Sequence, residues 1–542
     1  MGLRGLALAI LALLLLNPLL YASVTHAEGV TLRIISRHPG EILNKAKEEF
    51  LKSDIAKKYN IVNIKFYSYD PTLWVSAIQS AARKGNNIDV AWGGGPTLFD
   101  TLYEAGLLAP LEGGEVEKAI NEIPDTYAGA PMKRVGDDGK IYWVAASIAS
   151  FGFTVNHDVL NKYGLPVPQK WSDLASPVYA GPLVKENKPI VAIADPTRST
   201  SNTRMYEIIL QAYGWEDGWR NLTLLAANSL IEGGSADVRD DVILGRVGVG
   251  ITIDFYGYTA MQTNPACEYI LPEGESIVNG DPIALLSTSK NQEAAKAFIA
   301  WVLTEGQKVW FDPDINRLPS NPNAFNLPEG AKRQDLKQVY EKLSSVKGID
   351  FNDTLALEYE KGMQFYFKTV LVDLNNLLKE AWKKLVYLYT NGYISEEEFK
   401  AYAAKLGDPI EYTDPYTKQK VKWTLENAIE VTKTLKDPQK ASEAKTKYSA
   451  TWKKAATEKY KAILEELKNI EKTRTPGQAT KTSTEETTTT AATEKTTETG
   501  AKETGETTQT TTTETARGGV PVAAILVVIV LVALIVIVLR RR

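Results

Sequence analysis

Short apolar runs alternate with amphipathic segments through the first part of the chain, and this alternation restricts the fold more than any other feature. Three runs rich in β-branched and aromatic residues are expected to form strands: "TLRIIS" (31–36), "IVNIKFYSY" (61–69) and "IDVAWGG" (88–94). The segments 41–58 and 71–84 have the periodicity of helices. Strands that alternate with helices predict an α/β layer built on a largely parallel sheet.

A second set of apolar runs predicts a second α/β lobe. Residues 147–156, "SIASFGFTVN", are expected to lead out of the first sheet, and residues 190–196, "IVAIADP", to form a buried strand. The run "VGVGITIDFYGY" (247–258) is expected to cross back, and "DPIALLSTS" (281–289) to return as a strand of the first lobe. Two lobes joined by two crossovers enclose a cleft, and ligands of such sheets bind beyond the carboxyl ends of the strands.

The stretch "DPTRSTSNTRMYEIIL" (195–210) gathers many hydrogen-bond donors at the start of a predicted helix. A helix N-terminus has free backbone N–H groups and a positive dipole end, so it attracts anions. The candidate ligand-binding residues here are Arg198, Ser199, Thr200, Ser201 and Asn202, with further positive charge from Arg204. A helix cap uses only one or two hydroxyls, so this surplus favours a phosphate, carboxylate or charged chelate over a cap with extra polar residues.

Other candidates lie at the ends of predicted strands. These further candidate ligand-binding residues are Ser36, His38, Gly94, Gly95, Thr97 and Ser147. Glycines let a backbone approach a ligand closely, and a threonine at a helix start either donates to a ligand or caps the helix. A plain turn or cap remains the alternative role for each of them.

The order of these segments resembles the extracellular solute-binding proteins of ABC importers, in particular the cluster that carries ferric iron, thiamine, polyamines or phosphorylated small molecules. The resemblance is carried by "DVAWGGGPTLFDTLYEAGLLAPL", "SFGFTVNHDVL", "IADPTRSTSNTRMYEIIL" and "PEGESIVNGDPIALLSTSKNQEAAKAFIAWVLTEGQKVWF". It covers roughly residues 31–322 and implies a two-lobed type II periplasmic-binding-protein-like fold of family 1. It also implies a small solute as cargo, an ABC importer permease as partner, no cofactor and no enzymatic activity.

Asp254, Tyr256 and Tyr258 lie at the second predicted crossover and complete the set of candidate ligand-binding residues. In relatives that bind ferric iron, two adjacent tyrosines near this place supply phenolate ligands, whereas here Gly257 separates them. If the segment is extended, both rings point to the same side. In the main interpretation the site binds no metal ion. In an iron-binding alternative, Tyr256 and Tyr258 would be the iron ligands. Aromatic packing at the hinge is the other interpretation.

A cell-surface hydrolase or transferase acting on an anionic substrate is the alternative from a different class. His38 or His157 would be its base, and Ser147, Ser150 or Ser199 its nucleophile. The sequence contains neither the G-x-S-x-G nor the H-E-x-x-H motif. We therefore predict a binding protein without catalytic residues.

Composition limits the possible partners. The formal net charge of −4 does not imply binding to nucleic acid. Cys267 is the only cysteine, so a disulfide within the chain and a zinc site made of cysteines are both excluded.

The two ends of the sequence predict export and anchoring. Arg4, the apolar run after it and the small residues near Ala22 and Ala27 are typical of a cleaved secretory signal. The uncharged apolar run Val520–Leu539 would span a membrane as a helix, and the arginines after it place the body of the protein on the extracellular side of the cell membrane. The Thr-rich segment before this run has few large apolar residues and predicts a disordered stalk.

The predicted organisation combines these parts. It consists of a signal peptide (1–27), the first lobe (28–146), the second lobe (147–253), a return to the first lobe (254–328), a Lys- and Glu-rich helical extension (329–472), the stalk (473–518), a transmembrane helix (519–539) and a cytoplasmic tail (540–542).

Overall fold

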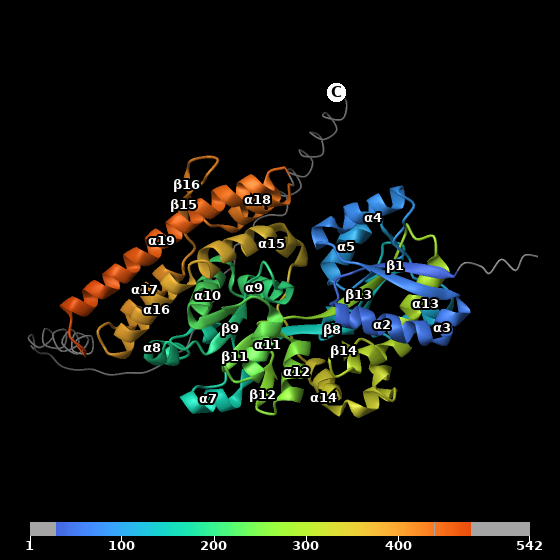
Figure 1. Ribbon diagram of the computed structural model, residues 1–542, viewed down its shortest axis with the longest axis horizontal. Helices are drawn as coiled ribbons and strands as arrows, with labels where there is room; N and C mark the ends of the chain where they lie inside the picture. The colour runs from blue at the N-terminus through green and yellow to red at the C-terminus, as the bar shows by residue number, and fades with distance from the viewer. Residues whose placement is uncertain (1–28, 438, 478–542) are drawn as a thin grey trace, which may run out of the picture. The chain divides into compact units, whose positions relative to one another are not determined.

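The structure is a computed structural model that describes residues 29–437 and 439–477 (Figure 1). It contains two α/β lobes, each with its own sheet and core, which confirms the predicted two-lobed α/β fold. The sheet of the first lobe has the order β2-β1-β3-β13-β8. Its strands are β1 Val30–Ser36, β2 Ile61–Tyr67, β3 Val90–Trp92, β8 Ile141–Asn156 and β13 Val278–Leu286, with the short edge strands β4 Leu108–Ala109, β7 Lys133–Val135 and β14 Leu318–Pro319.

The sheet of the second lobe has the order β10-β9-β11-β8, and β12 pairs with the other part of β8. Its strands are β9 Val191–Ala194, β10 Ser229–Glu232, β11 Val249–Ile253 and β12 Cys267–Ile270. Strand β1 is parallel to β2 and β3 in the first lobe, and β9 is parallel to β10 and β11 in the second, as the alternating pattern predicts.

Strand β8 belongs to both sheets. Its residues 144–150 pair with β13 in the first lobe, and residues 151–156 pair with β11 and β12 in the second. From Trp143 to Asn156 every side chain of β8 is buried, because helices or strands cover both faces. One strand therefore carries the chain from the first lobe into the second.

Helices cover both faces of the two sheets. In the first lobe they are α2 Gly40–Lys52, α3 Asp54–Lys58, α4 Trp74–Arg83, α5 Pro96–Glu104, α6 Gly114–Asn121, α13 Gln292–Leu303 and α14 Gln334–Leu343. In the second lobe they are α7 His157–Tyr163, α8 Gly181–Glu186, α9 Thr200–Tyr213, α10 Trp215–Asn228, α11 Ser235–Ile243 and α12 Asp254–Thr263. Shorter elements are the 3-10 helices η1 Pro71–Leu73, η2 Trp171–Ala175, η3 Glu305–Phe311, η4 Pro322–Asn326 and η5 Gly330–Lys332, and the hairpin of β5 Thr126–Tyr127 and β6 Ala130–Pro131.

The chain returns to the first lobe later than the sequence predicts. The apolar run 247–258 was expected to be a crossover, but only β11 is extended and α12 begins at Asp254. The next strand, β12, still pairs with the part of β8 that belongs to the second lobe, and the return is made by β13. On this helix Gly257 lies directly against the ring of Tyr269 on β12, where a Cβ atom would lie 2.4 Å from the ring, so glycine is the residue that fits.

The extension after the lobes packs on the second lobe. It consists of α15 Asp353–Phe367, the π-helical turn η6 Lys368–Val372, α16 Asn375–Thr390, α17 Glu396–Gly407, the hairpin β15 Glu411–Thr413 and β16 Lys420–Lys422, α18 Leu425–Lys436 and α19 Ala441–Thr473 (Figure 1). Phe367 stacks on Tyr206 of α9 with ring centroids 4.4 Å apart, and Tyr366 packs against Trp219 of α10. The extension and the second lobe therefore share one hydrophobic core.

Within the residues that the structure describes, no helix combines the length and the apolar character needed to cross a membrane. The predicted signal peptide, transmembrane helix and cytoplasmic tail, and the stalk apart from residues 473–477, lie outside the described residues.

Candidate functional site

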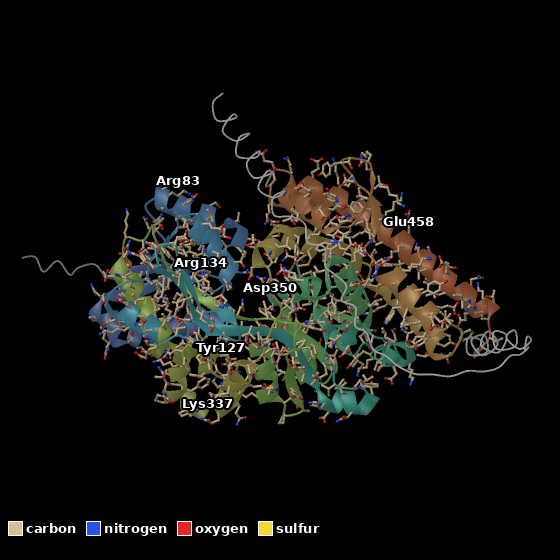
Figure 2. All side chains as sticks on the ribbon, turned by 180° about the vertical axis from the view of Figure 1, so that it is seen from behind. Arg83, Tyr127, Arg134, Lys337, Asp350 and Glu458 are labelled. Atoms are coloured by element: carbon tan, nitrogen blue, oxygen red, sulfur yellow. The ribbon has the colours of Figure 1, made fainter. Side chains whose placement is uncertain are left out.

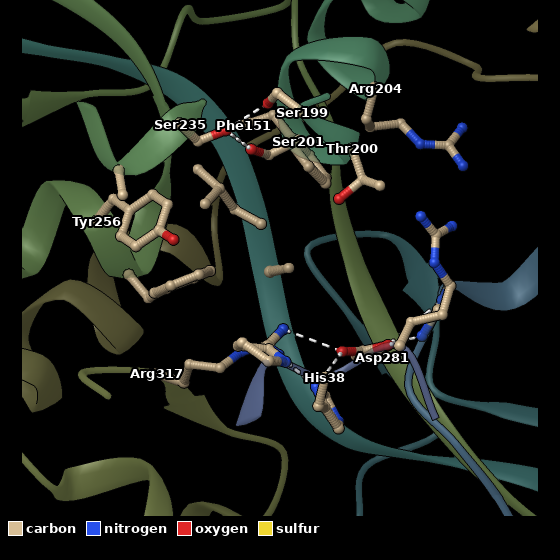
Figure 3. Close-up of a pocket in the computed structure, with 18 of the residues that line it drawn as sticks. His38, Phe151, Ser199, Thr200, Ser201, Arg204, Ser235, Tyr256, Asp281 and Arg317 are labelled. Atoms are coloured by element: carbon tan, nitrogen blue, oxygen red, sulfur yellow. Dashed lines mark hydrogen bonds and ion pairs between the residues drawn. The ribbon is translucent and has the colours of Figure 1, made fainter. Parts of the chain in front are cut away.

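A cavity of about 430 Å³ lies between the two lobes (Figure 3). Its walls are formed by residues that directly follow strands of both sheets, after β1 and β3 in the first lobe and after β9, β10 and β11 in the second. The carboxyl ends of these strands converge there, which is the place where open α/β sheets bind ligands.

The start of α9 forms one wall of the cavity. Ser199 caps the helix by accepting a hydrogen bond from the backbone N–H of Asn202, at 3.0 Å. Thr200 and Ser201 line the cavity, and the Ser201 hydroxyl lies 2.7 Å from that of Ser235 (Figure 3). Asn202 is buried and faces the other way, because its side-chain oxygen accepts the N–H of Ala194. The structure thus brings together Ser199, Thr200 and Ser201 at the cavity but not Asn202.

Four arginines reach the cavity, two from each lobe: Arg37, Arg198, Arg204 and Arg317. The stem of Arg37 packs on Gly94, where a Cβ atom would lie 3.1 Å from it. The Arg37 side chain makes neither a hydrogen bond nor an ion pair with the described residues. Burial lowers the pKa of Arg37, and the nearby Arg204 adds to this effect. Arg37 therefore faces the cavity as a desolvated cation with no carboxylate of the described residues in direct contact, and Glu360 is its main charged neighbour.

Asp281, Arg317 and His38 form a buried network at the base of the cavity (Figure 3). Asp281 lies 3.1 Å from Arg317, and Arg317 donates to Nδ1 of His38 at 3.2 Å. The backbone N–H groups of Gly94 and Gly95 donate to the same carboxylate at 2.7 and 3.3 Å. Both glycines have positive φ, of 126° and 84°, which favours glycine at these two positions. Both glycines line the cavity, and their amides bind Asp281.

Burial determines the charges in this network. It lowers the pKa of His38 to about 4, so the ring is neutral at pH 7 and can accept the hydrogen bond from Arg317. Burial alone would raise the pKa of Asp281, but Arg317 and His38 hold it below its usual value. Among the described residues of the cavity wall, Asp281 is the only carboxylate, and Arg317 already neutralises it.

Several predicted site residues lie away from the cavity. Ser36 donates to the backbone oxygen of Trp92, and Ser147 is fully buried in β8. Thr97 is buried and faces a groove between α5 and the extension. Asp254 accepts the N–H of Ser150 at 2.7 Å, and burial raises its pKa to about 6.

The structure separates the two tyrosines of the iron-binding alternative. Tyr256 lines the cavity, with the guanidinium of Arg239 over its ring at 4.9 Å. Tyr258 is only 4% exposed and packs against Tyr269. The two rings were predicted to share a side if the segment were extended, but on a helix residues two apart point in nearly opposite directions. Among the described residues, no group of three or more His, Cys, Asp or Glu side chains is placed to hold a metal ion.

Sequence reasoning missed several residues of the cavity wall: Arg37, Ser235, Phe255, Asn279, Asp281 and Arg317. Ser235 could have been found, because the run "EGGSADVRD" repeats the pattern of a strand followed by a polar helix start. Arg317 gives no local signal, since it reaches the cavity from a loop after η3, far along the chain from β1.

The described structure does not bring together the histidine base and the serine nucleophile that the enzyme alternative requires. In the described part of the chain, neither histidine ring is hydrogen-bonded to Ser147, Ser150 or Ser199. His157 pairs instead with Glu268 at 2.9 Å, on the surface of the second lobe.

Residues 48–338 match the family described as "Bacterial extracellular solute-binding protein". The chain belongs to this family, which confirms the resemblance seen in the sequence. It is therefore a solute-binding protein of the kind that serves ABC importers, and not an enzyme.

Among curated proteins, the chain is 27% identical over 301 residues to the phosphoglycerate transport regulatory protein PgtC of Salmonella typhimurium, covering 55% of this chain and 68% of the relative. Solved structures with a similar fold include the periplasmic binding protein P5PA, with 20% identity and a TM-score of 0.45 over 64% of this chain and all of that one. Another is AfuA from Actinobacillus pleuropneumoniae with bound fructose-6-phosphate, with 18% identity and a TM-score of 0.45 over 67% of this chain and all of that one.

Proposed function

We propose that the protein captures a small anionic solute, with a phosphate or carboxylate group, in the interlobe cavity and delivers it to the permease of an ABC importer. The charge of the cavity wall carries this proposal. Four arginines line the cavity, and the one carboxylate among the described residues of its wall is already paired with Arg317; Asp353 pairs with Arg204 from outside the wall. A wall with more guanidinium groups than carboxylates favours an anion, because guanidinium groups donate charge-assisted hydrogen bonds to carboxylate and phosphate.

The two lobes would bind different sides of the solute. The first lobe presents Arg37, and the second lobe presents the hydroxyls and N–H groups at the start of α9. A solute that contacts both lobes stabilises their closed arrangement, since its interactions are complete only there. Apolar side chains such as Phe151 and Ile253 complete the wall and would contact the carbon atoms of the solute.

The name of the relative PgtC supports a phosphorylated carboxylate as the first compound to test. PgtC is named for phosphoglycerate transport, and the chain covers 68% of its length. A phosphoglycerate carries two anionic groups, which suits a cavity that has arginines on both lobes.

The ends of the chain lead us to propose that the protein is tethered to the membrane. The signal peptide, the Thr-rich stalk and the apolar run Val520–Leu539 would hold the body outside the cell near its permease. Tethering of this kind raises the effective concentration of a binding module at its partner.

Isothermal calorimetry tests the proposed solute class. The full chain in nanodiscs would be titrated with 3-phosphoglycerate, inorganic phosphate, citrate and ferric citrate. Arg37→Ala should weaken binding of the tightest anion about 10- to 100-fold, because each hydrogen bond to a charged group contributes roughly 1.5–3 kcal/mol and about 1.4 kcal/mol is tenfold. Arg83→Ala, on the exposed surface of α4, is the matched control and should bind as wild type does. Failure of all four compounds to bind wild type would contradict the proposal.

A further inference from the structure

We propose that the helical extension forms part of the solute site, where Asp353 at the start of α15 is a positioning residue for the Arg204 guanidinium. This inference rests on the proposed function, since it gives Arg204 the task of binding a second anionic group of the solute. The family match ends at residue 338, so Asp353 and the rest of α15 lie outside it.

The extension contacts Arg204 from two directions. Asp353 Oδ1 lies 2.9 Å from Nη1 of Arg204, and the ring of Phe351 lies 4.9 Å from the guanidinium carbon. Glu207 on α9 approaches the same nitrogen at 3.2 Å. All of these ion pairs use Nη1, so Nε and Nη2 have no hydrogen bond or ion pair within the described residues. The ion pairs thus lie at one edge of the guanidinium, where Nη1 makes no hydrogen bond with the described residues, and the other edge remains for a ligand.

Two carboxyl groups act on Arg204, Glu207 from α9 and Asp353 from the extension. Glu207 is only 1% exposed, and burial raises its pKa to about 8. Burial also raises the pKa of Asp353, but its side chain is 26% exposed, Arg204 counteracts the shift, and the first turn of α15 places the carboxylate where the helix dipole stabilises it. Asp353 is therefore the more exposed of the two carboxyl groups beside Arg204, and the one that the extension contributes.

Helix α15 is held firmly on α9. The backbone N–H of Asn352 donates to the side chain of Gln211 at 2.7 Å, and the Gln211 amide donates back to the Asn352 carbonyl at 2.9 Å. About three helical turns further along α15, Gln364 donates to Thr203 at 3.1 Å, and the Asn352 side chain caps α15 itself. These bonds fix where Asp353 lies relative to Arg204.

The same helix also contacts the first lobe. Lys361 of α15 forms an ion pair with Asp70 at 2.8 Å, on the loop after β2. Asp350, which Figure 2 labels, belongs to the segment that leads into α15. This segment lines a groove together with Asp100 of α5. Glu360 is the strongest charged neighbour acting on Arg37. Helix α15 therefore places carboxylates near one cavity arginine of each lobe.

Two separate places on the cavity wall can bind anionic groups. In Figure 3 the Arg204 guanidinium lies apart from the hydroxyls of Ser199 and Ser201. One anionic group would bind at the hydroxyls and the other at Arg204. The extension would then favour solutes with two anionic groups over those with one.

The test compares Asp353→Asn and Asp353→Glu in the full chain, with Glu358→Gln as the matched control. Glu358 lies on the same helix and is exposed, and it makes no ion pair with Arg204. Asp353→Asn should weaken 3-phosphoglycerate at least tenfold and inorganic phosphate less than threefold. Asp353→Glu should restore most of the affinity, and Glu358→Gln should bind as wild type does. Thermal unfolding of each variant shows that the fold is retained.

The outcomes separate this inference from the proposed function. If Arg37→Ala weakens binding but Asp353→Asn behaves as Glu358→Gln does, the inference is wrong and the proposed function stands. If wild type binds none of the anions, the proposed function fails, and a crystal structure of Asp353→Asn still tests the positioning. A guanidinium that keeps its direction in that variant would overturn the inference, and one that turns away would support the positioning.

Discussion

Burial, more than charge, determines what the single residues around the cavity can do. His38 is a neutral acceptor for Arg317 because its pKa is lowered to about 4, and this makes it a poor base for the enzyme alternative. Arg37 has no described carboxylate within ion-pair distance, and burial lowers its pKa although Glu360 acts against this effect. These states follow from side chains that come from distant parts of the chain.

The lowered pKa of His38 predicts a loss of stability in acid. The unfolded chain takes up a proton near pH 6.5, whereas the folded protein resists it down to about pH 4, so the free energy of unfolding falls as the pH drops through this window. The difference between about 4 and 6.5 corresponds to roughly 3 kcal/mol. Asp254, with its pKa raised to about 6, acts in the opposite direction. The quantity to measure is therefore the stability of wild type minus that of His38→Gln.

Urea denaturation at pH 7, 5.5 and 4 would check this prediction. The stability difference should fall by roughly 3 kcal/mol from pH 7 to pH 4. The same comparison with His157→Gln, whose ring is on the surface, serves as the control. A difference for His38→Gln that stays constant with pH would show that the ring is protonated equally in both states.

At the scale of helices and strands, the sequence pattern predicted an element correctly where the local pattern and the tertiary packing favour the same structure. The start of α9 could be predicted because a buried strand, a capping serine and the following helix are contiguous in sequence. The segment 254–258 could not, because its alternating aromatics fit a strand, whereas in the fold it begins helix α12, which packs Gly257 against Tyr269 of β12. Asp281 and Arg317 were missed since only the tertiary fold brings them to Gly94 and His38.

The shared core predicts that the extension and the second lobe unfold together. Trp423 is fully buried, stacks on Tyr366 at 4.4 Å and packs against Trp452. Trp423→Ala should lower the free energy of unfolding by about 3–5 kcal/mol, because it removes a large side chain and leaves a cavity. Tyr416→Ala, at an exposed position, should cost far less.

Urea denaturation followed by circular dichroism would measure both variants. A single transition that shifts for Trp423→Ala is the expected result. A separate early transition, with the second lobe still folded, would instead show that the extension is an independent unit.

At the scale of the whole molecule, the sequence of the two ends predicts an anchored extracellular protein. The protein should stay with membranes through a high-salt wash, because an inserted helix is not displaced by salt. Deletion of residues 520–542 should release it to the medium, which immunoblotting of cell and medium fractions would detect. A deleted form that remains on the membrane would mean that the anchor lies elsewhere.

The central claim is that an anion binds between the two lobes, against arginines from both. A crystal structure of the protein with the tightest-binding compound of the calorimetric panel tests it most directly. We expect the anionic group of that compound in the cavity, within hydrogen-bond distance of Arg37 and of Thr200 or Ser201, with the two lobes closed around it. A compound bound outside this cavity, or inside it without contact to either arginine-bearing wall, would contradict the account.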